Sequence, residues 1–237
     1  MSAALTLPAV AWRWQWVPAS DAPEADAAAW LTSTADVFTG WARDGLTDAT
    51  ALPPEVRAEV TPEGVGRVVA LWLWGRAGEC PPGARLVWGA AFTSADRPRW
   101  APVLVTVEFR VPLADDPSYL MDDVGARGAD DDARPAVVDY VTTAAGDGLR
   151  VGALVREPYG AAAFRVDAAV RIDVPAHDDS GATAVDVLLA TRVQDLGLAG
   201  VVGPGVEELM HLVAEQFLPG PDGTTGIVLA PAERSMP

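Results

Sequence analysis

Residues 103–111 have the sequence VLVTVEFRV, in which apolar and polar side chains alternate. Successive side chains of a β-strand point to opposite faces, so the alternation predicts a strand with one apolar face. Residues 163–174, AFRVDAAVRIDV, repeat the pattern, and their polar side carries arginine and aspartate in turn. Alternating opposite charges favour a sheet that packs on one side and faces solvent on the other.

Other segments predict further strands and two main helices. The strands are expected at 11–17, 67–74, 85–92, 136–143, 149–156 and 183–193. Helices are expected at 21–43 and 205–218, where apolar residues recur with helical spacing behind capping or proline residues. Because the connections are short, antiparallel hairpins are favoured over crossovers. We therefore expect an α+β fold, a mainly antiparallel sheet of six or more strands with helices packed on it in a sandwich-like arrangement.

The domain organisation follows from a change in composition at residues 112–135. This segment carries seven aspartates and several small residues, which is typical of a partly mobile surface excursion. We interpret residues 1–220 as a single α+β domain whose strand-rich halves, 1–111 and 136–220, are joined by this acidic excursion. Residues 221–237 are expected to form a loose tail.

The overall composition excludes several classes of function. The chain has no lysine and no asparagine, so Schiff-base, pyridoxal phosphate and P-loop chemistry lack their lysine. The formal charge of −16 disfavours nucleic acid and anionic membranes, and favours a cation or a basic protein patch. The single cysteine, Cys80, excludes an internal disulfide, and the N-terminus lacks the basic region of a signal peptide. No apolar run approaches the ~20 residues of a membrane-spanning helix, so a soluble cytoplasmic protein is expected.

Few residues point to catalysis or metal binding. The metal-ligand candidates are Asp122, Asp123, Asp130, His177 and Asp178. None forms a known metal-binding spacing, and solvated acidic loops explain them more simply. Glu208 and His211 stand three residues apart on one helix, but a di-iron element needs a second such pair. Cys80 lies in a turn with no base beside it in the sequence. We expect no catalytic residue, no cofactor and no tightly bound transition metal.

The nine tryptophans are the strongest candidates for ligand binding, and all lie within the first 100 residues. On the expected strands, one face carries three of them and another face carries two, namely Trp12, Trp14, Trp16 and Trp72, Trp74. Such clusters line ligand pockets or partner interfaces, but they more often form the core. Both interpretations remain open from the sequence.

Residues 136–218 resemble actinobacterial proteins of the PsbP-like sandwich type. The resemblance runs from Asp139 through VDVLLATRVQDL to the helix GVEELMHLVAEQF. It implies an α/β/α sandwich with an adaptor-like or unassigned role, and it implies no site residue.

Three functional hypotheses follow. The first is a non-enzymatic binding or protein-interaction module, because no set of catalytic groups is present beside ample core material. The second is a carrier of small hydrophobic ligands in a tryptophan-lined pocket. The third is a metal-assisted hydrolase using His177, Asp178, Asp179 and His211. Self-association is also expected, since unprotected strand edges pair readily and symmetric dimers are common.

Overall fold

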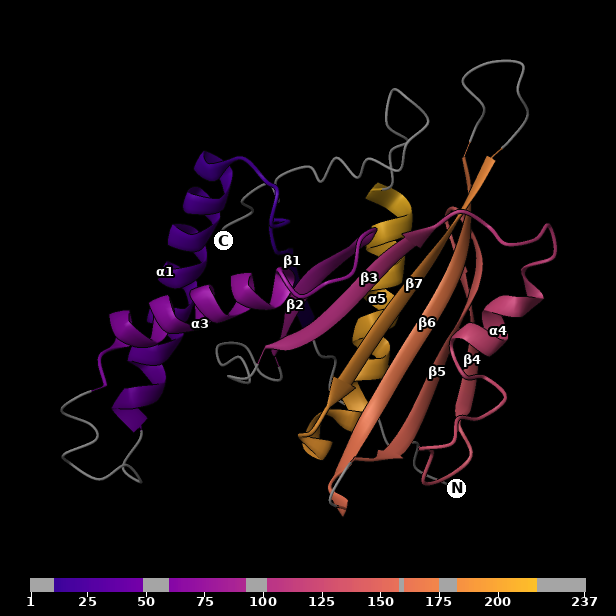
Figure 1. Cartoon of the computed structure of the whole chain (residues 1–237). Coiled ribbons are helices and arrows are strands. Elements are labelled where there is room, and N and C mark those ends of the chain that lie inside the picture. Colours follow the sequence, from indigo (N-terminus) through magenta and orange to yellow (C-terminus); the bar gives the residue numbers. More distant parts are fainter. Residues whose placement is uncertain (1–10, 49–59, 93–101, 158–159, 175–182, 217–237) are drawn as a thin grey trace, which may run out of the picture. The chain divides into compact units, whose positions relative to one another are not determined.

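The structure is a computed structural model that describes residues 11–48, 60–92, 102–157, 160–174 and 183–216. It contains seven strands in the order β1-β2-β3-β7-β6-β5-β4, with antiparallel pairing (Figure 1). The expected α+β class, with a mainly antiparallel sheet of six or more strands, is confirmed. The chain divides into two compact units, Met1–Leu104 and Val105–Pro237, here called unit 1 and unit 2. The interpretation of residues 1–220 as a single domain stays a prediction.

Unit 1 combines a strand pair with two helices. Its elements are β1 (Ala11–Trp16), α1 (Glu24–Asp48), α3 (Pro62–Ala77) and β2 (Ala84–Phe92), and β3 (Val103–Arg110) begins at its end. Strands β1 and β2 pair so that the ring of Trp14 lies on Gly89, where any side chain would collide with it. Helices α1 and α3 approach closely at Gly66, since a Cβ atom there would meet the backbone and side chain of α1.

The core of unit 1 is aromatic. Trp88 is fully buried, and its ring centroid lies 5.0 Å from that of Phe38 and 6.0 Å from that of Trp41. Val17, Trp30, Leu73 and Leu86 belong to the same cluster. The prediction of a helix over 21–43 is thus confirmed by α1, whose apolar stripe supplies several of these rings.

The predicted strand over 67–74 is wrong, because these residues lie inside helix α3. Thr61 caps the helix by accepting a hydrogen bond from the Gly64 N–H at 3.0 Å. Pro62 occupies the first turn and Glu63 suits its positive end. The alternating valine, leucine and tryptophan residues imitate a strand, but this cap and the packing against α1 determine a helix.

Unit 2 contains the other five strands and their covering helices. After β3, the elements are η1 (Pro117–Tyr119), α4 (Leu120–Asp123), β4 (Val137–Thr143), β5 (Gly146–Arg156), β6 (Ala162–Val174), β7 (Thr183–Val193), η3 (Leu196–Leu198) and α5 (Ala199–Gln216). Helix α5 lies along one face of the sheet and α4 lies on the other (Figure 1). The first turns of α5 precede the predicted helix 205–218, so that Pro204 lies inside it.

Helix α5 is a core helix of this unit. Val206, Leu209, Met210 and Val213 are buried on the side that contacts β4–β7. The segment Leu196–Gln216 also has the length and composition of a membrane-spanning helix, with a mean hydropathy of 1.2. Buried core helices of soluble proteins share this length and composition, so they alone do not identify a membrane segment.

The opposite face of the unit 2 sheet is covered by residues 112–135. Leu120 and Val124 are buried against Leu149 and Val151 of β5. Arg165, on the polar side of 163–174 that we expected to meet solvent, is only 6% exposed, and Asp186 of β7 is 1% exposed. The solvent-facing assignment is therefore wrong at Arg165, because the acidic segment folds over it.

Candidate functional site: the outer face of helix α3

Helix α3 carries apolar residues on both its buried and its exposed side. Gly66, Ala70, Leu73 and Ala77 are buried on its inner side. On its outer side Val68 is 65% exposed, and Leu71, Trp72 and Trp74 are 45%, 46% and 37% exposed. We call these four residues, together with Arg67, the α3 outer face. A contiguous exposed apolar surface of this kind is typical of interaction sites.

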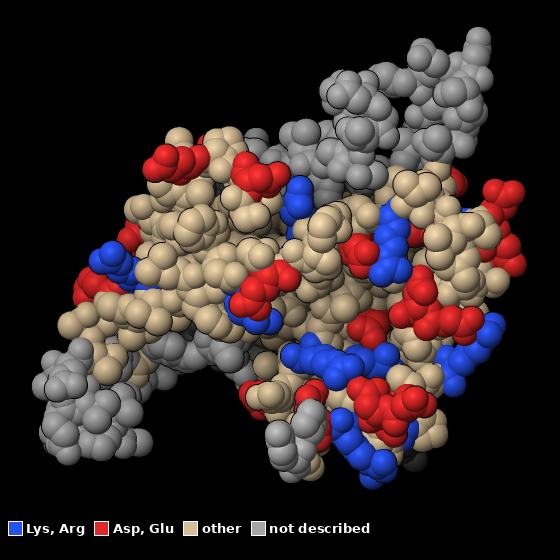
Figure 2. Space-filling view, viewed as in Figure 1, with Lys and Arg blue, Asp and Glu red and all other residues tan. Residues whose placement is uncertain are grey.

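Ion pairs lie at the two ends of the α3 outer face, and Arg67 is its one charged residue. Arg43 pairs with Glu63 at 3.0 Å near one end, and Arg76 pairs with Glu79 near the other. Between them, at the left of Figure 2, the surface is mostly uncharged. Helix α3 contains Glu63, Arg67 and Arg76, a sum of +1 in a chain of −16. Arg67 is exposed and has no ion-pair partner within the described ranges.

The five tryptophans proposed as ligand-binding residues fall in two separate groups. Trp12 and Trp14 stack on one face of β1, with ring centroids 4.8 Å apart and planes 7° from parallel. Trp16 is half-buried on the same strand. Trp72 and Trp74 lie on the outer side of α3, where helical geometry turns their side chains to different directions. They do not share a strand face, because α3 is a helix.

A polar cluster in unit 2 holds the acidic segment on the sheet. Asp186 of β7 accepts hydrogen bonds from Arg171 Nε at 2.8 Å and from the Tyr119 hydroxyl. The same hydroxyl accepts from Arg171 Nη2 at 2.8 Å and from the Leu113 N–H at 2.7 Å. Arg171 Nη1 donates to the Asp115 carbonyl oxygen at 2.7 Å. These groups satisfy one another, so the cluster is suited to fastening the segment rather than to chemistry.

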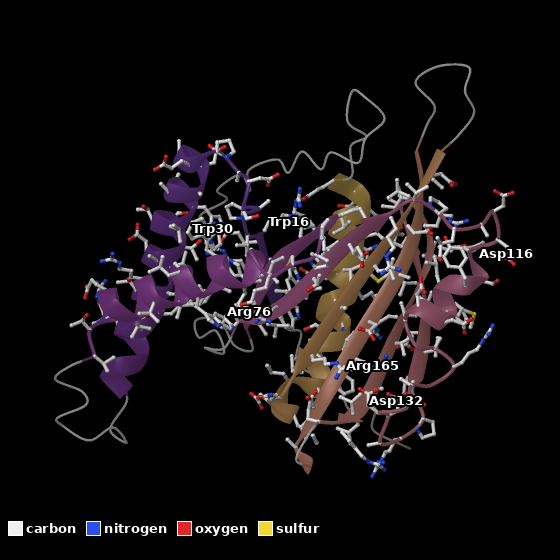
Figure 3. The ribbon with its side chains drawn as sticks, in the orientation of Figure 1. Trp16, Trp30, Arg76, Asp116, Asp132 and Arg165 are labelled. Carbon is white, nitrogen blue, oxygen red and sulfur yellow. The ribbon has the colours of Figure 1, made fainter. Side chains whose placement is uncertain are left out.

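A second cluster centres on Arg165 of β6. Its Nη1 donates to Asp167 at 2.8 Å and its Nη2 to Asp132 at 3.1 Å (Figure 3). Burial raises the pKa of Asp167 to about 6, although Arg165 opposes the shift. Gly125 lies directly against the guanidinium with φ 66°, a conformation and a space that only glycine fits.

The candidate metal ligands do not converge. Asp122 pairs with Arg127 at 3.0 Å and Asp123 with Arg110 at 3.3 Å, while Asp130 is exposed. In the part of the chain that the structure describes, no three His, Cys, Asp or Glu residues are placed to hold a metal ion. His177 and Asp178 lie outside the described residues.

Cys80 belongs to unit 1, whereas Glu208 and His211 belong to unit 2. Burial raises the pKa of the Cys80 thiol, which disfavours the reactive thiolate. Glu208 and His211 border an open hollow of about 360 Å³ on the outer side of α5, together with Pro204, Glu207, Leu212 and Glu215. Burial raises the pKa of Glu208. None of the described tryptophans borders this hollow.

Comparisons with known proteins add no assignment. No protein-family model matches the chain, and no curated protein or solved structure is significantly similar to it. The resemblance of residues 136–218 to PsbP-like sandwich proteins therefore stays a prediction.

Proposed function

We propose that this chain is a non-enzymatic protein-interaction module that binds an amphipathic helix of a partner protein on the α3 outer face. The single observation that carries the proposal is the exposure of Val68, Leu71 and Trp72, which stand at helical positions i, i+3 and i+4. This spacing forms a ridge that packs into the groove of a second helix.

The charge around the ridge defines the partner's chemistry. Arg67 lies on the same side of α3 as Leu71 and Trp74, which are four and seven residues further along the helix. It has no ion-pair partner in the described part of the chain. A partner helix with an apolar stripe and a flanking Glu or Asp would complement both features. Tryptophan and arginine are also the residues that most often dominate binding energy at interfaces.

The proposal is tested by a photo-crosslinking amino acid placed at Val68 in the cells that make the protein. The matched control places it at Ala29, an exposed position of α1. We expect one foreign protein to be crosslinked at position 68 only, through an amphipathic helical peptide. Equal crosslinking at both positions, or crosslinking only between copies of this chain, would contradict the proposal.

The crosslinked peptide then gives a quantitative test. Trp72→Ala should weaken its binding by about 30-fold, the loss expected for an interface residue of about 2 kcal/mol. Arg67→Glu should also weaken binding of the peptide, and its effect should grow as the ionic strength is lowered. Arg134→Glu, an exposed charge reversal in unit 2, should leave binding unchanged. A response that is equal for the two arginine variants would rule out the assigned role of Arg67.

A further inference from the structure

Strand β4 forms an uncovered edge of the unit 2 sheet. It is the terminal strand of the order, and among the described segments it pairs with β5 alone. Val137 and Tyr140 are 63% and 78% exposed on it. Within the described ranges, no backbone hydrogen bond joins β4 to any other segment. An edge of this kind presents a row of unpaired N–H and C=O groups to the surroundings.

The end of β5 that extends past β4 is covered by backbone hydrogen bonds from the acidic segment. Beyond the end of β4, the Ala133 N–H donates to the Leu154 carbonyl at 2.7 Å, and the Arg156 N–H donates to the Asp131 carbonyl at 2.9 Å. The acidic segment therefore occupies the exposed part of β5, but it leaves β4 open. The sequence of β4, VVDYVTT, also lacks the proline or lysine that usually protects an edge.

The charge of β4 is suited to meeting an identical strand. Its only charged residue is Asp139, and that carboxylate is bound by Arg150 of the same chain at 2.6 Å. Two chains of formal charge −16 repel each other over most surfaces, but β4 itself contributes a single carboxylate, beside Arg150, which also pairs with Glu207 at 2.9 Å. A second copy can therefore approach here at low electrostatic cost.

We infer that β4 pairs with β4 of a second copy, antiparallel about a two-fold axis at Tyr140. In this register all seven residues find partners, since Tyr140 faces Tyr140 and Val138 faces Thr142 of the other copy. Asp139 faces Val141, so the two aspartates do not oppose each other. The two-fold arrangement makes one continuous sheet from two chains and closes the edge. The inference is independent of the proposed function, because it uses a different surface in a different unit.

The first test is the mass of the full chain by light scattering across micromolar concentrations. We expect a species of twice the 24.8 kDa chain mass at the upper concentrations. Tyr140→Lys should raise the dissociation constant at least about tenfold, since lysine on an edge opposes strand pairing. Val111→Lys, the same kind of change at another exposed position of unit 2, should leave it unchanged. Circular dichroism of each variant checks that the fold is retained.

The second test reads the register directly, in a Cys80→Ser background. Opposed Cα atoms in an antiparallel pair lie about 4.5–5.5 Å apart, within reach of a disulfide. Tyr140→Cys should therefore crosslink with itself. Val138→Cys should not, because the two copies of position 138 would be four residues, about 13 Å, out of register. A mixture of Val138→Cys and Thr142→Cys chains should crosslink.

Three results would overturn the inference. They are a monomer at all concentrations, a dimer that resists Tyr140→Lys, and a dimer without the Tyr140→Cys crosslink. A dimer that is lost with Trp72→Ala, but not with Tyr140→Lys, would place self-association on the α3 outer face. That result would contradict both the β4 pairing and the proposed binding of a partner helix.

Discussion

In unit 1 the interior is built from aromatic rings, whereas in unit 2 it combines aliphatic side chains with buried ion pairs. All nine tryptophans precede residue 104, and the indole N–H groups of Trp30 and Trp88 have no acceptor in the described part of unit 1. In unit 2, Asp186 is buried but receives hydrogen bonds from both Arg171 and Tyr119. Unit 1 should therefore respond to changes of side-chain volume, and unit 2 to changes of charge and pH.

The largest effect should come from the aromatic core of unit 1. Trp88→Ala removes a fully buried ring that contacts Phe38 and Trp41, so the free energy of unfolding should fall by about 3–5 kcal/mol. Chemical denaturation followed by circular dichroism measures the loss. A change below about 1 kcal/mol would show that ring packing does not dominate this unit.

The next largest effect should come from the buried charges of unit 2. Asp186→Ala leaves Arg171 without its carboxylate partner in a buried site, and the expected cost is about 3 kcal/mol. The variant should also make the 112–135 segment more accessible to protease, because Tyr119 loses its acceptor. Asp173→Ala, at an exposed position of the same sheet, serves as the control. Equal losses in the two variants would contradict a role for burial.

A smaller effect should appear as a pH dependence specific to unit 2. The pKa of Asp167 is about 6 in the folded chain against an ordinary value of 3.8. The folded state thus binds this proton more tightly, and the resulting stabilisation is full below about 3.8 and lost as the pH rises through 6. Between pH 7 and pH 5, wild type should gain about 1 kcal/mol relative to Asp167→Asn. Denaturation at both pH values checks the sign, and an opposite sign would mean that Arg165 outweighs burial.

The smallest effect should be found on the α3 outer face. Val68→Ser should change the free energy of unfolding by less than about 0.5 kcal/mol, because Val68 is mostly exposed. Leu73→Ala, on the buried side of the same helix, should cost about 2–5 kcal/mol. A comparable loss in both variants would indicate that unit 1 covers this face itself, which would remove the basis for a partner there.

The sheet could be predicted because strand periodicity is a local property. Residues 103–111 and 163–174 alternate over enough positions to exclude a helix, and β3 and β6 follow them closely. Helix α3 was missed because valine, leucine and tryptophan alternate within it. The available signal was Thr61, Pro62 and Glu63, a cap, an N-terminal proline and a favourable acidic residue just before that run.

The arrangement of the charged residues could not be predicted from local patterns. Arg165 and Asp132 are 33 positions apart, and Tyr119 and Asp186 are 67 apart. Arginine and aspartate alternate along β6 in the same way whether water or another segment covers them. The acidic composition of 112–135 favoured a solvated loop, but Asp123, Asp131 and Asp132 pair with arginines that lie on the sheet. The exposure of the α3 outer face could not be predicted either, because it depends on which side of the helix meets α1.

The register of β3 sets the order in which unit 2 is completed during synthesis. Thr106 pairs with Ala190, and these residues are separated by 190 − 106 = 84 positions. By contrast β4, β5, β6 and β7 pair with their neighbours along the chain. During synthesis, β2 and the three local hairpins can therefore pair first, while the second edge of β3 has no partner until β7 is made. Because an unpaired strand edge is prone to aggregation, we expect the yield of folded protein to depend on how quickly translation reaches residue 193.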